Sequence, residues 1–228
     1  MSITVPASQS AISTSEESFA GLKRFVLDFV QGADDPSLLA VAGREINNAI
    51  NRINSRKWNW SRKSYDITLA ESDSDYSLPA NYKRPLRMQL LNSSSQVIGS
   101  VNYVLAEEFL DCGWPTAGDG NADAYTVLSV SNDRLVRFNR TLSATFIATY
   151  PTARHYYYSR VSHFTNESQS LDSLGCPTEF WDFIGWTARA SMATIRGTNA
   201  TSAQQLAEMA WVRLISDDND VHTDWEHR

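Results

Sequence analysis

Cysteine is scarce in this sequence, and the two residues present are not placed for a shared task. Cys112 and Cys176 are the only cysteines in 228 residues. Small secreted domains carry several cysteines as disulfide pairs, and metal sites use close pairs such as Cys-x-x-Cys. We therefore expect two free thiols in a reducing compartment. The fold must rest on its own apolar core, for which a chain of this length is sufficient.

Positive charge is also in short supply. The chain has 20 Lys and Arg residues against 26 Asp and Glu residues, which gives a net charge of -6 at pH 7. Proteins that hold nucleic acid are normally basic, because neutralised phosphates supply much of their affinity. This balance disfavours a protein that binds DNA or RNA over a wide surface.

Long apolar runs are missing from the whole sequence. None approaches the roughly 18 residues needed to cross a bilayer, so we expect no membrane contact. The first segment, MSITVPASQSAISTS, has neither the basic part nor the apolar part of a signal peptide. We predict a soluble protein made in a cytoplasm, with a flexible N-terminus at residues 1–15.

Signatures of catalysis are equally missing. The sequence contains no P-loop, nucleophile elbow or zinc-protease motif. Asp119, Asn121 and Asp123 have the spacing of a calcium loop. However, Ala124 replaces the glycine that such a loop needs at its turn, and Val130 replaces its bidentate glutamate. A solvated loop is therefore favoured over a calcium site.

The four histidines do not form the pattern of a metal site. Neither His155 with His163 nor His222 with His227 has the i, i+4 spacing of two ligands on one helix. No cysteine lies close to them in the sequence. We expect surface imidazoles, no metal, no cofactor and no enzyme activity.

Helical periodicity is present at both ends of the chain. Two apolar segments at each end follow a 3.6-residue period, and each pair predicts a helix hairpin. Leu206 and Met209 are among the apolar positions of the last helix. The four segments are Phe19–Val30, Leu38–Arg56, Phe180–Ile195 and Leu206–Ile215.

Start signals support these helices. Asp35-Pro36 combines an N-cap carboxylate with proline at the first helical position. Thr178 and Thr201 are expected to cap the two C-terminal helices.

Between the hairpins the apolar period changes from 3.6 to 2, which predicts strands. Asn132-Asp133 is typical of a hairpin turn. We therefore predict an antiparallel β meander. The strand candidates are Tyr65–Leu69, Leu86–Leu90, Val97–Leu105, Ala124–Val130, Arg134–Arg140, Ser143–Tyr150 and Arg154–Ser159.

The order of these elements predicts an α+β fold. The two helix hairpins, residues 16–60 and 177–216, are expected to pack as a four-helix bundle. An antiparallel β-meander or sandwich domain, residues 61–176, is inserted between them. Residues 217–228 form a polar, acidic C-terminal tail.

Three short clusters are candidates for function. RHYYYSR, residues 154–160, places tyrosines on both faces of a strand, where they fit a protein interface or a platform for sugars or bases. SRKWNWSRK sets Trp58 and Trp60 among four basic residues like a small nucleic-acid patch, against which the net charge argues. Glu107 and Glu108 are candidate general acids of a glycan hydrolase, although two adjacent acids more often form a solvated face.

The succession of motifs resembles a known family. In INNAINRINSRKWNWSRKSYDITLAESDSDYSLPANYKRPLRMQLL, a helix rich in Ile, Asn and Arg runs into a Trp-containing strand, an acidic turn and a Tyr-x-Leu-Pro step. GWPTAGDGNADAYTVLSV leads into the meander, and CPTEFWDFIGWTARASMATIRGTNATSAQQLAEMAW forms the closing helix pair. From about Phe19 to Ile215 the chain resembles the head-to-tail adaptor proteins of tailed bacteriophages, in particular the tail tubular protein A type of short-tailed phages.

The resemblance implies structural work at the head–tail junction of a virion rather than catalysis. Such adaptors form a dodecameric ring that docks on the portal protein and extends the DNA channel. They offer a platform to the next tail protein, a nozzle or tube, and DNA passes through the lumen without specific binding. We expect the same homo-oligomer, portal and tail partners for this chain.

Within that framework, aromatic residues receive expected roles. The seam between the helices and the β domain is expected at Trp58, Leu78 and Pro79. The side chains expected to contact a neighbouring subunit or partner are those of Trp60, Tyr76, Tyr82, Tyr156 and Tyr158.

The acidic tail is expected to dock on the portal through His222, Trp225 and His227. Two rival functions stay open. One is a carbohydrate-binding tail component that recognises a host surface glycan through an aromatic groove around Tyr156–Tyr158. The other is a cell-wall hydrolase that uses the adjacent glutamates of the middle third.

Overall fold

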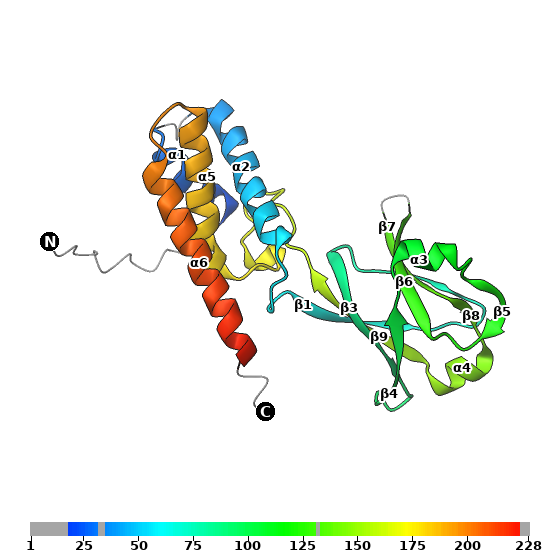
Figure 1. Cartoon of the computed structure of the whole chain (residues 1–228). Helices are drawn as coiled ribbons and strands as arrows, with labels where there is room; N and C mark the ends of the chain where they lie inside the picture. Colours follow the sequence, from blue (N-terminus) through cyan, green and yellow to red (C-terminus); the bar gives the residue numbers. More distant parts are fainter. Residues whose placement is uncertain (1–17, 32–34, 131–132, 224–228) are drawn as a thin grey trace. The chain divides into compact units, whose positions relative to one another are not determined.

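The computed structural model describes residues 18–31, 35–130 and 133–223, and the chain forms two compact units (Figure 1). Of the described residues, those up to 59 and those from 161 onward form the helical unit, and those between 60 and 160 form the β unit. The α+β class predicted from the change of period is confirmed. The segment 161–176, which we assigned to the β domain, belongs to the helical unit.

The helical unit contains the helices predicted at the two ends of the sequence. Helix α5 packs against α1, α2 and α6, and apolar side chains such as Leu22, Ile50 and Phe183 are fully buried among them. The four helices are α1 (Phe19–Asp28), α2 (Pro36–Ser55), α5 (Trp181–Ile195) and α6 (Thr201–Thr223).

The start of α2 follows the sequence prediction. Asp35 Oδ1 accepts the backbone N–H of Ser37 at 2.9 Å, and Pro36 is the first helical residue. This arrangement satisfies one of the N–H groups that a helix start leaves without a partner.

The predicted caps of the C-terminal helices are wrong. Thr178 begins a short 3-10 turn, η2 (Thr178–Phe180), and α5 starts only at Trp181 without a side-chain cap. Thr201 is the first residue of α6, and its N–H donates to Asn199 Oδ1 at 2.9 Å. Both errors are small shifts in register, because residue preferences locate a helix end only within a few positions.

Helix α6 continues past Ile215, where we expected it to end, and reaches Thr223. Much of the segment predicted as a tail is therefore helical. Residues 224–228, which include Trp225 and His227, lie outside the described part of the chain.

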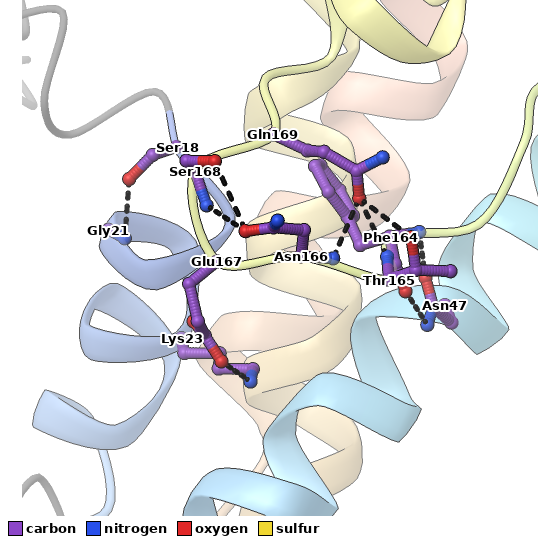
Figure 2. A network of polar contacts seen from close by, with 10 residues as sticks. All are labelled: Ser18, Gly21, Lys23, Asn47, Phe164, Thr165, Asn166, Glu167, Ser168 and Gln169. Atoms are coloured by element: carbon purple, nitrogen blue, oxygen red, sulfur yellow. Dashed lines mark hydrogen bonds and ion pairs between the residues drawn. The ribbon is translucent and has the colours of Figure 1, made fainter.

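The segment that returns from the β unit is held by three asparagines of α2. The amide of Asn54 accepts the Val161 N–H at 2.8 Å and donates to the Val161 carbonyl at 2.9 Å. Asn47 pairs in the same way with Phe164, at 2.9 and 3.1 Å (Figure 2). Their spacing puts the amides on one face of the helix, where they act like a partner strand. We call this set the asparagine ladder: Asn47, Asn51 and Asn54.

The middle member of the ladder and helix α1 secure the same segment further. Asn51 Oδ1 lies 2.8 Å from His163 Nε2. Figure 2 shows Lys23 of α1 beside Glu167, with 2.5 Å between Nζ and Oε1. The segment is therefore built into the helical unit although it has little regular secondary structure.

The β unit contains a seven-stranded mixed sheet in the order β1-β9-β3-β4-β6-β7-β2. Strand β9 lies between β1 and β3, and β4 pairs with β6 in parallel. The predicted antiparallel meander is therefore wrong in its strand order and in this one pairing. The strands are β1 (Arg62–Thr68), β2 (Asp75–Ser77), β3 (Tyr82–Leu91), β4 (Val97–Tyr103), β6 (Ala124–Val130), β7 (Asp133–Phe138) and β9 (Thr152–Ser159).

Smaller elements complete the β unit. Strands β5 (Thr116–Gly120) and β8 (Arg140–Leu142) pair in parallel as a second, two-stranded sheet. Two short helices, α3 (Ala106–Asp111) and α4 (Ala144–Thr149), lie between strands. The turn predicted at Asn132-Asp133 includes a position outside the described residues, and β6 and β7 pair on either side of it.

Helix α4 occupies the segment that we predicted as the strand Ser143–Tyr150. The hydroxyl of Ser143 caps it by accepting the Phe146 N–H at 3.2 Å. Phe146 belongs to the sheet's core, and Ile147 and Tyr150 pack against it. These positions also fit a helical face, so alternation alone did not distinguish a strand from a single helical turn.

Candidate assembly surfaces

Trp58 is a core residue of the helical unit. It is 1% exposed, and its indole Nε1 donates to the Ile53 carbonyl at 2.8 Å. Its ring lies edge-on to Phe180 and to Trp211 of α6. Trp60 lies half-buried on the β-unit side of the division. The seam role expected for Trp58 and the interface role expected for Trp60 stay predictions.

The residues expected around the start of β3 fix one another within the β unit. The Tyr76 hydroxyl donates to the Ala70 carbonyl at 3.2 Å and accepts the Ala70 N–H at 3.0 Å. Leu78 packs against the sheet's core. The Pro79 carbonyl accepts the Tyr82 N–H at 2.9 Å. A loop secured in this way sets the register at which β3 begins.

Tyr82 lies in the interior of the β unit, at 1% exposure. Its ring contacts those of His155 and Tyr157, and the Arg134 guanidinium lies 5.7 Å from its centroid. Burial raises the pKa of its hydroxyl above the ordinary range. We expected this side chain to be shared with a neighbouring subunit, but the structure places it in the core.

His155 is also fully buried, so the expectation of a surface imidazole is wrong for this residue. Positions Ala153, His155 and Tyr157 of β9 point to the same inward face, because side chains alternate along a strand. The rings of Tyr82, Tyr125 and Tyr157 surround the imidazole. Burial lowers the pKa of His155 to about 4, so the ring is neutral near pH 7.

The other residues considered as metal ligands either form structural hydrogen bonds or lie apart from one another. Asp123 Oδ1 accepts the side-chain amide of Asn139 at 2.6 Å, which ties two parts of the β unit together. Among the residues that the structure describes, no group of three His, Cys, Asp or Glu side chains is placed to hold a metal ion. His222 lies near the end of α6.

Glu107 and Glu108 are exposed in the first turn of α3. Acidic side chains at this position interact favourably with the N-terminal end of a helix. Only Phe109, their neighbour, is buried. The apolar surroundings that would make either glutamate a general acid are therefore not formed around them.

The outer face of β1, β9 and β3 carries a cluster of cations. In the strand register Tyr156 lies between Ser64 and Arg87, and Tyr158 lies between Arg62 and Arg84. The guanidinium of Arg87 is 4.7 Å from the centroid of Tyr156, which is a cation–π contact. Lys63 pairs with the inward-facing Tyr157 in the register, but it lines the same groove as Arg62 and Arg87 and is included for that reason. We call this set the basic strip: Arg62, Lys63, Arg84 and Arg87.

The basic strip borders a groove of about 560 Å³. Tyr156 is half-buried there, whereas Tyr157 and Tyr158 are buried. Further along the same face Arg154 forms a two-pronged ion pair with Asp66, at 2.7 and 2.8 Å. The groove is lined by Arg62, Lys63, Ser64, Leu86, Arg87 and Tyr156.

Helix α6 presents exposed apolar residues that we did not predict. Leu206, Met209 and Val212 are 38%, 69% and 64% exposed, and their spacing of three places them on one side of the helix. The buried positions of this helix among the described side chains are Ala203, Ala207 and Leu214. Small side chains allow α6 to approach α5 closely, and the larger residues are left outside. We call Leu206, Met209 and Val212 the α6 stripe.

The β3–β4 hairpin exposes apolar side chains as well. Val97 and Ile98 are adjacent in β4 and therefore point to opposite faces of the sheet, yet both are about half exposed. The two units thus carry unlike exposed surfaces. One is an apolar stripe on a long helix, and the other combines cations with an aromatic ring and lies on a sheet.

No helix in the described part of the chain is long and apolar enough to span a membrane. A search of curated proteins found no match. The family model described as SU10 adaptor protein matches residues 18–224, which include both units. This chain therefore belongs to the SU10 adaptor protein family, a structural family of phage head-to-tail adaptors found in the virion.

Proposed function

We propose that this chain assembles as a ring at the head–tail junction, docks on the portal protein, and carries the next tail protein on its other side. The observation that supports the ring is that each copy exposes surfaces of unlike chemistry, among them the α6 stripe and the basic strip. A cyclic ring needs two different faces on every copy, because each subunit contacts its two neighbours differently. Twelve copies would match the dodecameric adaptors that the sequence resembles.

The helices α1, α2, α5 and α6 would act as one four-helix bundle in this ring. Their mutual packing through α5 supports that role. The bundle would supply a rigid body, and the β unit would supply a second body with its own surfaces.

The charge distribution supports passage of DNA without tight binding. Residues 60–160 contain ten Lys and Arg and ten Asp and Glu, so the segments of the helical unit account for the whole net charge of -6. A lumen lined by acidic helical units would repel phosphate, and DNA would slide through.

The end of α6 is the part that we propose for portal docking. His222 lies near its end, and Trp225 and His227 follow in the sequence. An aromatic residue on an acidic segment can anchor in a cleft between portal subunits. The carbohydrate-binding alternative is less well supported, since Tyr157 and Tyr158 are buried and leave only Tyr156 accessible.

Native mass spectrometry of the full chain, alone and with the portal ring of the same virus, tests this proposal. We expect about one adaptor per portal subunit. Truncation after Thr223 should weaken portal binding while leaving the circular dichroism spectrum and melting temperature unchanged. A chain that stays monomeric and does not bind the portal would contradict the proposal, and glycan binding would then be tested.

A further inference from the structure

The basic strip combines features of a protein contact. None of its four cations has a carboxylate partner among the residues that the structure describes. Three of the four are arginines, and Arg62, Lys63 and Arg87 line one groove together with Tyr156 and Leu86. Arginine and tyrosine are enriched at protein interfaces, where lysine is depleted. The strip also lies on the face of the sheet, so a partner can dock there without adding a strand to the edge.

The helical unit carries a surface of the opposite charge. Residues 161–188 contain four acidic residues and neither Lys nor Arg. Glu167 pairs with Lys23, whereas the other three are exposed and have no ion pair within the described residues. We call these three the acidic patch: Asp172, Glu179 and Asp182.

Two members of the acidic patch, Asp172 and Glu179, lie near the buried thiol of Cys176. Burial, and after it the charges of Glu179 and Asp172, raise the pKa of Cys176. Asp182 lies in the first turn of α5, one turn beyond Glu179. The local field is therefore negative, and a cationic surface of another molecule would be attracted to it.

Two kinds of polyanion fit the basic strip: an acidic protein surface and a nucleic acid. The net charge of -6 repels a uniformly anionic polymer such as DNA, whereas two copies of this chain carry both signs of charge and can align opposite patches. A second copy of this chain brings the complementary acidic patch at a known place. Charge complementarity therefore favours the second copy.

Resting on the ring proposed above, we infer that the basic strip of one copy docks on the acidic patch of the next copy. Each chain contains both surfaces, so the same contact repeats around a closed ring. Exposed ion pairs contribute little singly, and the contact gains its specificity from several pairs and from Tyr156.

Charge reversal on each surface, followed by a charge swap, tests this inference. The variants are R62E/R87E on the strip and D172K/E179K on the patch. A third chain carries all four substitutions and is called the four-fold variant. Asp182 is left unchanged because its carboxylate interacts favourably with the start of α5. R24E/R140E is the control for R62E/R87E. It lowers the net charge by the same amount, at two exposed arginines outside the strip.

Each chain is examined by native mass spectrometry alone and with the portal ring, after circular dichroism has verified its fold. We expect either reversal to weaken ring formation by roughly tenfold or more. The four-fold variant should recover to near the wild-type level, and R24E/R140E should behave as the wild type. Assembly of the wild type should also weaken as salt rises from 0.05 to 0.5 M, because salt screens these charges.

Recovery in the four-fold variant separates this contact from portal binding, since the portal is unchanged. The inference is overturned if either reversal assembles normally, or if the four-fold variant stays as weak as its parents. It is also overturned if R62E/R87E loses only affinity for duplex DNA. A wild-type chain that never assembles would refute the ring and this contact together, whereas normal rings in every variant would refute the contact alone.

Discussion

The two units differ most in what fills their interiors. The helical unit is held by apolar and aromatic packing, in which Trp58 contacts Phe180 of η2 and Trp211 of α6. The β unit buries an imidazole among three tyrosines. An aromatic core loses stability mainly when volume is removed, whereas a buried titratable ring also makes stability depend on pH. Four predictions test this contrast.

Trp58→Ala should have the largest effect and should act on the helical unit. Removal of a buried tryptophan costs about 3–5 kcal/mol of unfolding free energy, because a large cavity remains. Hydrogen exchange followed by mass spectrometry should show loss of protection in α2 and α6. Trp58→Phe keeps a ring and should cost less. Unchanged exchange in the helical unit of the alanine variant would contradict the packing described here.

Tyr82→Ala should destabilise the β unit by a similar amount, about 3–5 kcal/mol. This expectation replaces an interface role for Tyr82, because the side chain is buried. Tyr82→Phe is the matched control and should be nearly neutral, since it keeps the ring and removes only the hydroxyl. Chemical denaturation monitored by exchange in β3 and β9 measures both. Full stability of the alanine variant would return Tyr82 to the list of interface candidates.

The stability of the β unit should fall with acid between pH 6.5 and pH 4. The pKa of His155 is lowered to about 4 in the folded chain and is near 6.5 when unfolded. Within this window the unfolded chain binds the extra proton, so acid favours unfolding, by roughly 3 kcal/mol at full effect.

The surrounding tyrosines do not titrate in this range, so His155→Phe should flatten the pH dependence of the β unit. Denaturant midpoints at pH 4.5 and 7 measure the difference. An equal decline in the phenylalanine variant would assign the acid sensitivity to other groups.

Asn54→Ala should have the smallest effect of the four. It removes two hydrogen bonds to Val161 and leaves backbone groups without their partner, at a cost of about 1–3 kcal/mol. Faster exchange at residues 161–164 would identify the loss. Asn48→Ala is the control, because Asn48 is exposed and its amide donates to Glu45 of the same helix. Equal effects of the two substitutions would argue against the ladder.

Local periodicity was sufficient to predict the helices at both ends and most of the strands. Asp35-Pro36 located the start of α2, because a cap and a proline act within one turn. The strand order could not be predicted, since β9 pairs with β1 and β3 from a distant part of the sequence. Neither could the exposed side of α6, because the close approach of alanines to α5 outweighed the hydrophobicity of Met209.

The candidate surfaces were predicted only in part. RHYYYSR indicated a surface of interest, and Tyr156 does line the groove. The neighbouring Tyr157 and Tyr158 are buried, which depends on what covers each face of the sheet. The asparagines of INNAINRIN were noticed as a motif, but their partners lie more than 100 residues away, so their role required the structure.

The interruption of the helical unit by the β unit has a consequence for synthesis on the ribosome. Helices α1 and α2 are made first, and α5 follows only after the complete β unit. At about 5–20 residues per second, that delay is on the order of ten seconds. During this time the apolar face of α2 has no α5 to cover it, whereas the β unit is continuous and can fold at once. We therefore expect the inserted β unit to fold before the helical unit is complete. Residues 161–164, which the asparagine ladder binds, are made only after the β unit.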